Sequence, residues 1–144
     1  MRSDTESHGS SLAPHISVTG GNKALDFYQT AFGAMVTDKV TADDGNRVRY
    51  AALRINNCLL YLSDEFPEMG AASTPSPATL GGTAGAIHLG FASLAEAEGA
   101  FRRAVDAGCE ILMPMTDTDW GARYGRLRDP FGHVWSFGGP LAAS

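Results

Sequence analysis

The 144-residue chain has little cysteine, few basic residues and no long apolar run, and each shortage excludes a class of protein. Cys58 and Cys109 stand alone in apolar, strand-like stretches, which predicts reduced thiols in or near the core rather than a disulfide framework. Eleven Lys and Arg against 16 Asp and Glu give a net charge of -5, which disfavours nucleic acid and anionic membranes as partners. No run is long enough to cross a bilayer and no signal peptide is recognisable, so we expect a cytoplasmic protein.

Several catalytic signatures are also missing. The chain has no nucleophile elbow, no phosphate-binding glycine loop and no dinucleotide fingerprint. Its hydrophobic content of 44% is ordinary for a globular protein, and its length suits one domain.

The sequence does contain an internal repeat: the same order of expected strands and helices occurs twice. In residues 12–63, alternation and helical spacing predict a strand at 15–19 and a helix at 22–32. Three strands follow, at 34–41, 47–55 and 58–63. Residues 85–138 repeat the order, with a strand at 85–92, a helix at 94–107, and strands at 110–114, 124–128 and 133–137. The repeat predicts an α+β fold built from two tandem βαβββ units.

The two expected helices have recognisable ends. Asn22 is a candidate N-cap for the first helix, and Gly33 is a candidate stop signal. Ser93 with Glu96 three residues later is typical of a capping box, and Gly108 ends the second helix.

Three segments interrupt or flank the repeat. Residues 64–84 are rich in Pro and Gly and are expected to form a linker loop, which is long enough to be functional. Residues 1–11 are expected to be a disordered tail in which His8 has no role, and residues 139–144 a C-terminal tail. The domain itself is therefore expected over residues 12–138.

A turn, Asp129-Pro130-Phe131-Gly132, joins the last two expected strands. Together with His133-Val134-Trp135 it resembles the final hairpin of the vicinal oxygen chelate superfamily, which includes glyoxalase I, extradiol dioxygenases and bleomycin-resistance proteins. The runs 24–34 and 64–70 are similar to the PhnB-like branch, so the resemblance covers most of residues 12–138. It implies two curved mixed sheets around a concave cavity, one helix packed outside each, a small-molecule ligand and a homodimer.

In metal-dependent members of that superfamily, the first and fourth strands of each unit supply ligands. Spacing from the two helices places the matching positions at Ala13, Tyr61, Ala86 and Ser136. Alanine has no donor, and neutral Tyr and Ser are poor ligands for divalent metals. We therefore expect neither a metal ion nor another cofactor.

His15 and His88 lie two residues after Ala13 and Ala86, and hence on the same strand faces. They are at equivalent places in the two units. Three interpretations remain open: polar residues that shape a pocket, a general acid and base, or displaced metal ligands with Asp64 or Glu65.

The leading functional hypothesis is metal-independent binding of an aromatic or amphipathic compound, in the manner of a bleomycin-resistance protein. The alternative is a lyase or isomerase of the glyoxalase/dioxygenase superfamily that uses His15 and His88, so the sequence leaves open whether the protein is an enzyme. The expected ligand-binding residues are His15, Ser17, Leu59, Tyr61, His88, Trp120, Arg123, Tyr124 and Ser136.

Overall fold

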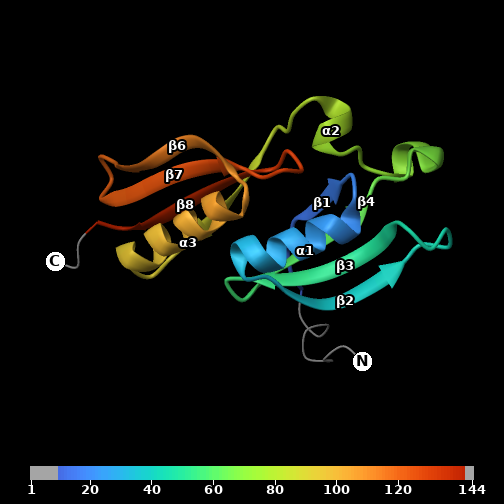
Figure 1. Cartoon of the computed structure of the whole chain (residues 1–144), viewed down its shortest axis with the longest axis horizontal. Coiled ribbons are helices and arrows are strands. Elements are labelled where there is room, and N and C mark those ends of the chain that lie inside the picture. The colour runs from blue at the N-terminus through green and yellow to red at the C-terminus, as the bar shows by residue number, and fades with distance from the viewer. Residues whose placement is uncertain (1–9, 142–144) are drawn as a thin grey trace. The chain divides into compact units, whose positions relative to one another are not determined.

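A computed structural model describes residues 10–141 of the chain (Figure 1). The expected N-terminal tail falls largely on residues 1–9, His8 among them, and the end of the C-terminal tail falls on residues 142–144. Both stretches lie outside the described residues. No helix within the described part is long and apolar enough to cross a membrane.

The chain divides into two compact units. The first runs through Gln29 and resumes over Gly33–Ser76, and the second consists of Thr30–Phe32 and the chain from Pro77 onward. The first contains the strands β1 (His15–Val18), β2 (Met35–Thr41), β3 (Val48–Ile55) and β4 (Cys58–Asp64) and most of helix α1 (Gly21–Phe32). The second contains β5 (Ala86–Gly90), α3 (Leu94–Ala107), β6 (Glu110–Asp117), β7 (Ala122–Arg128) and β8 (Val134–Pro140).

Each unit forms one four-stranded mixed sheet with the same topology. The strand order is β1-β4-β3-β2 in the first and β5-β8-β7-β6 in the second, and only the β1–β4 and β5–β8 pairs are parallel. The α+β architecture of two tandem βαβββ units predicted from the sequence is confirmed.

One face of each sheet is buried against its helix, and the other face is open. In β1, Ile16 and Val18 are buried, whereas His15 is exposed. The largest fully buried side chains of the second unit, Leu127, Trp135 and Phe137, likewise come from β7 and β8. Strand alternation therefore directs His15 away from the core.

Helix α1 is capped differently from the expectation. Its N-cap is Gly20, at a φ of 88°, and Asn22 lies inside the first turn, so the prediction of Asn22 as the cap is wrong. The carboxylate of Asp64, from the end of β4, instead accepts the N–H groups of Gly20 and Gly21, both at 2.9 Å. A residue 44 positions away thus does the work of a local cap.

Helix α3 follows its local signals. The Ser93 hydroxyl accepts the N–H of Glu96 at 3.1 Å, which confirms the predicted N-cap. Gly108 ends the helix at a φ of 126°, and Gly33 ends α1 at a φ of 67°.

Three features differ from the sequence-based expectations. The linker contains a 3-10 segment, η2 (Pro67–Ala72), and a short helix, α2 (Pro77–Leu80). β8 continues through Pro140, beyond the expected end of the domain at residue 138. Cys109 is buried, but Cys58 is exposed because it directly follows the tight turn at Asn56 and Asn57.

Candidate ligand-binding site

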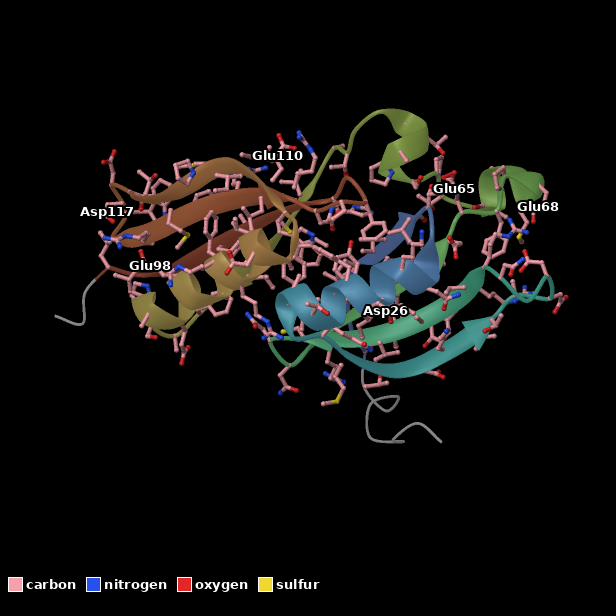
Figure 2. All side chains as sticks on the ribbon, in the orientation of Figure 1. Asp26, Glu65, Glu68, Glu98, Glu110 and Asp117 are labelled. Carbon is pink, nitrogen blue, oxygen red and sulfur yellow. The ribbon has the colours of Figure 1, made fainter. Side chains whose placement is uncertain are left out.

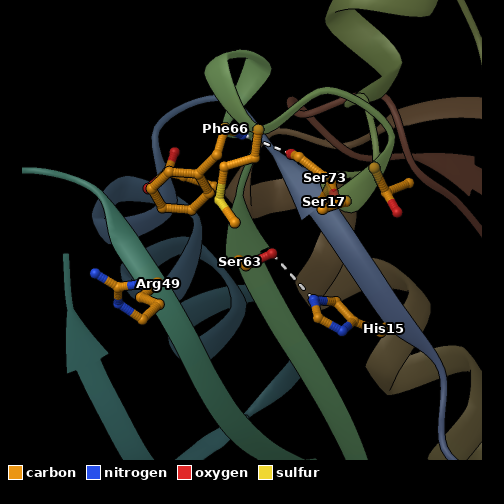
Figure 3. A pocket seen from close by; sticks show the side chains of 10 residues that line it. His15, Ser17, Arg49, Ser63, Phe66 and Ser73 are labelled. Carbon is orange, nitrogen blue, oxygen red and sulfur yellow. Dashed lines mark hydrogen bonds between the residues drawn. The ribbon is translucent and has the colours of Figure 1, made fainter.

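The open face of the first sheet carries a polar pair. The Nε2 of His15 lies 3.0 Å from the hydroxyl oxygen of Ser63, on the neighbouring strand β4 (Figure 3). Ser17 pairs with Ser63 in the register and lies on the same face as His15. The hydrogen bond fixes the ring of His15 and leaves its other nitrogen for a further partner.

A β-bulge adds an arginine to this face. Val40 pairs with Tyr50 and Thr41 with Val48, so Arg49 is the extra residue of the bulge. Figure 3 shows its side chain on the same face as His15 and Ser63. Its guanidinium lies 3.6 Å from the carboxylate of Asp43, and the side chain of Asp43 is fully exposed. Such a contact is weak, so Arg49 can still receive a polar ligand group.

The neighbouring Arg47 has a different role. Its guanidinium contacts Asp44 at 2.6 Å and Glu68 at 2.7 Å, and its carbon Cζ lies 4.3 Å from the centre of the Phe66 ring. The hydrogen bonds with Glu68 and Asp44 raise the pKa of Arg47 above its ordinary value. Arg47 therefore ties the segment after β4 to the start of β3.

The segment 65–76 folds over one end of the sheet. The N–H of Phe66 donates to the Ser73 hydroxyl at 2.6 Å, and the N–H of Ser76 donates to the carboxylate of Glu65. Ser76 is fully buried and its hydroxyl is 2.9 Å from that of Thr19. These bonds hold the rings and methyl groups of the segment beside the open face (Figure 3).

A cavity of about 190 Å³ lies between this segment and the sheet. The sheet provides its polar wall, and the segment provides its apolar wall. It is lined by His15, Ser17, Arg49, Ser63, Asp64, Phe66, Met69, Ala72, Ser73 and Thr74. The walls come from the first unit alone.

Asp64 borders the cavity, but its oxygens are already used. Besides capping α1, its carboxylate accepts the N–H of Val48 at 2.7 Å. An added Cβ at Gly21 would lie 2.5 Å from Oδ2 of Asp64, so glycine is required for this close approach. Three backbone N–H groups donate to the buried carboxylate, so its role is structural.

The remaining candidates in the first unit lie outside the cavity. Tyr61 is on the open face, with its ring centre 6.3 Å from that of His15 and 5.5 Å from that of Tyr50. Leu59 is half-buried, two residues before Tyr61 on the same strand face. Both extend the apolar surface of the sheet away from segment 65–76.

The open face of the second sheet also brings predicted residues together. The Nδ1 of His88 lies 2.7 Å from the hydroxyl oxygen of Ser136. The ring of Tyr124 is stacked against that of His88, with centres 5.9 Å apart and planes 14° apart. Trp120 meets Tyr124 edge-on at 6.2 Å. Four of the expected residues therefore form one cluster, on β5, β7 and β8 and the turn before β7.

Arg123 is not part of that cluster. Its guanidinium contacts Glu98 of α3 at 2.6 Å and Asp117 of β6 at 2.6 Å (Figure 2). The hydrogen bonds with Asp117 and Glu98 raise its pKa above the ordinary value. Two carboxylates thus pair with the guanidinium of Arg123 on the side of the sheet that faces α3.

The ligand-binding residues expected from the sequence do not include Arg49, Phe66, Met69 or Arg126. The bulge that turns Arg49 onto the open face leaves no clear mark in the sequence. Phe66 and Met69 were visible as apolar residues in a Pro- and Gly-rich segment, which is the usual sign of a covering loop.

The donor set does not fit a metal ion. Among residues 10–141, no three His, Cys, Asp or Glu side chains are grouped so that they could hold one. Each open face has one histidine with a serine partner, and Asp64 and Glu65 are engaged by backbone N–H groups. The displaced metal site considered from the sequence thus lacks its carboxylates.

The Glyoxalase/Bleomycin resistance protein/Dioxygenase superfamily model matches residues 13–137. With this match and the paired βαβββ sheets, the chain belongs to that superfamily. Uncharacterized proteins of Mycobacterium bovis and Mycobacterium tuberculosis are 40% identical to it over 130 residues. The match covers 90% of this chain and 83% and 74% of those proteins, respectively.

Solved structures show the same fold. TioX from Micromonospora sp. ML1 matches with a TM-score of 0.68 and 25% identity over 92% of this chain and all of that one. FosX, a fosfomycin resistance protein of Listeria monocytogenes, matches with a TM-score of 0.64 and 17% identity over 94% and 92% of the two chains. That structure holds manganese(II) and a dihydroxypropylphosphonic acid. At this identity the likeness extends to the fold alone.

Proposed function

We propose that the chain binds a small aromatic or amphipathic compound without a metal ion, in the manner of a bleomycin-resistance protein. The observation that carries the proposal is the cavity of about 190 Å³ in the first unit. A cavity of roughly 150 Å³ holds benzene, whereas drug-sized ligands need about 300 Å³ or more. The expected ligand is therefore a single ring with a few substituents.

The walls fit such a compound in chemistry as well as in size. The Phe66 ring and the Met69 thioether offer an apolar, polarizable surface. On the opposite wall, His15 and Ser63 offer hydrogen-bonding groups that are already held in place by each other. A ligand with an apolar ring and one polar substituent would satisfy both walls.

The test is a titration with phenol, followed by nuclear magnetic resonance of the histidine ring protons. The chain has four histidines, and replacement of His15 by Gln assigns the His15 signal. Phenol should move the His15 signal in a saturable way. If no His15 shift develops up to the solubility limit of phenol, the proposal is wrong.

Matched variants locate the binding within the cavity. Ala72 lines the cavity and Ala71 does not, yet both are exposed residues of η2. Ala72→Phe should fill part of the space and weaken phenol binding by about tenfold or more. Ala71→Phe should leave binding unchanged, and equal loss in both variants would contradict the assignment.

The alternative is a lyase or isomerase that uses His15 and His88 as acid and base. It is favoured by the hydrogen bond of each histidine to a serine, which orients the imidazole for proton transfer. Exchange of the acidic C–H protons of phenylacetone with deuterated water would test it. Exchange above the buffer rate that disappears in His15→Gln or His88→Gln would support catalysis.

Three further expectations belong with this proposal. We propose that the chain forms a homodimer, because each open sheet leaves two edge strands unpaired. We also propose a cytoplasmic location and membership of the PhnB-like branch. Sedimentation of the purified protein at several concentrations would test the dimer.

A further inference from the structure

Arg126 differs from three other arginines of the chain, which form close ion pairs. Arg47, Arg123 and Arg128 each contact a carboxylate at 2.6–2.9 Å. Within residues 10–141, the guanidinium of Arg126 instead has one hydrogen-bond partner, the phenol oxygen of Tyr124 at 3.1 Å, and no carboxylate. A half-buried cation without a counter-ion is a ready receptor for an anion.

Arg126 belongs to a group of four polar side chains on three strands, with hydrogen bonds between Arg126 and Tyr124 and between His88 and Ser136. The register aligns Arg126 with Ser136 and Ser136 with His88, so the three side chains share the open face of the second sheet. Tyr124 lies two residues before Arg126 on the same face. Hydrogen bonds with Ser136 and with Arg126 lower the pKa of the Tyr124 phenol below its ordinary value. Each of these four side chains carries an N–H or O–H donor, and none of them is a carboxylate.

An aromatic surface adjoins the guanidinium. Tyr124 is stacked on His88 and meets the edge of Trp120, whose side chain is 72% exposed. Gly138 makes this packing possible, because an added Cβ would lie 3.0 Å from Cε1 of His88. A tryptophan so exposed beside two stacked rings offers a flat surface for another ring.

We propose that the open face of the second unit is a binding site for a planar organic acid, separate from the cavity of the first unit. The carboxylate of the ligand pairs with the guanidinium of Arg126 and accepts the phenol proton of Tyr124 in a hydrogen bond. The ring of the ligand packs against Trp120. The proposal goes beyond the proposed function, since it adds a second site and a different class of ligand.

The charge of the site selects the kind of acid. The site contains one fixed positive charge, and the whole chain has a net charge of -5. A polyphosphate or a nucleic acid would meet one arginine and a repulsive protein, whereas one carboxylate balances one guanidinium. An aromatic monocarboxylate thus matches both the charge and the flat surface.

The test is a titration of the full chain with benzoate, followed by tryptophan fluorescence. The chain has two tryptophans, and Trp135 is 1% exposed, so a quench should report on Trp120. Benzoate should quench the emission saturably, and the quench should disappear in Trp120→Phe. Benzamide, which has the same shape without the charge, should bind at least about tenfold more weakly.

Matched variants on one strand separate the site from general charge effects. Arg126→Gln should weaken benzoate binding by about tenfold or more, and Tyr124→Phe by a few-fold. Arg128→Gln, two residues along β7, removes the same charge from a guanidinium paired with Glu110 and should change little. Unchanged melting temperatures would show that the variants are folded.

Three results would overturn the proposal: no benzoate quench, equal binding of benzoate and benzamide, or equal loss in Arg126→Gln and Arg128→Gln. The histidine signals distinguish this failure from failure of the proposed function. If benzoate moves only the His15 signal, the acid binds in the first unit. That result would contradict the second site and support the cavity.

Discussion

The two units share one topology, but their helices are capped and joined to the sheets by different residues. In the first, the helix begins at a glycine and takes its cap from Asp64 of β4. In the second, Ser93 caps the helix locally, and the position equivalent to Asp64 is Gly139. An added Cβ at Gly139 would lie 3.0 Å from the carbonyl oxygen of Ser93. One unit therefore joins helix to sheet with a buried carboxylate, and the other does so by close packing of backbone.

The open faces differ in the same way. Each has a histidine hydrogen-bonded to a serine. Among residues 10–141, only the first open face has a covering segment, and the cavity of about 190 Å³ lies beneath it. The second is open, with an arginine that has no carboxylate partner in the described residues and an exposed tryptophan. The framework is the same in the two units, and we propose different ligands for them because the residues on their open faces differ.

The largest effect is expected from removing the distant cap. Asp64→Ala would leave three backbone N–H groups without their acceptor, and it should lower the free energy of unfolding by about 3 kcal/mol. Ser93→Ala removes one such bond and should cost about 1 kcal/mol. Urea denaturation measures both.

Asp26→Ala is the control for the loss of a carboxylate, because Asp26 is an exposed residue of α1 (Figure 2). It should change stability by less than about 0.5 kcal/mol. If Asp64→Ala is no more destabilising than Ser93→Ala, the difference between the two caps is not real.

Two glycines of the second unit should respond to alanine in opposite directions. At Gly125, an added Cβ would lie 2.9 Å from Phe101 and from the sulfur of Met115, so Gly125→Ala should cost about 1–3 kcal/mol. At Gly99, inside α3, nothing lies within 4 Å, and Gly99→Ala should add up to about 1 kcal/mol. Thermal unfolding of both variants checks the sign, and a stabilising Gly125→Ala would contradict the packing described.

Cys58 of the first unit should react with thiol reagents much faster than Cys109 of the second unit. Burial and the nearby charge of Asp129 raise the pKa of Cys109 to about 12, so its thiol stays protonated at pH 8. Cys58 is exposed and free. A disulfide reagent at pH 8 should titrate one thiol in the folded protein and two in denaturant. Rapid reaction of both thiols in the folded state would contradict the burial of Cys109.

A smaller effect is expected in the tyrosine titration. The Tyr124 phenol should ionise below the usual range, because its hydrogen bonds with Ser136 and Arg126 favour the phenolate. The phenolate absorbance should therefore rise at a lower pH than in Tyr124→Phe. Superimposable titration curves would show that the Tyr124 phenol is not hydrogen-bonded as described.

Local signals in the sequence predicted most of the fold. The α3 cap at Ser93, the helix ends at Gly33 and Gly108, and the order of strands all follow from residues within a few positions of each element. The cap of α1 did not, because Asp64 lies 44 and 43 positions after Gly20 and Gly21, whose N–H groups it accepts. Nothing near Gly20 indicates such a partner.

The candidate sites show the same limit. The resemblance supplied Ala13 and Ala86 as cavity-facing positions, and alternation from them placed His15 and His88 on the open faces. It failed for Arg49, because a bulge shifts the phase of β3 at that residue. Arg123 and Arg126 look alike in the sequence, and only their partners separate them: two carboxylates for the first and a phenol for the second.

The most direct test of two different sites is one pair of titrations observed through the assigned ring signals of His15 and His88. Phenol should move the His15 signal, and benzoate should move the His88 signal. If both probes move both signals equally, or if neither probe moves either signal, the two units do not bind ligands as described.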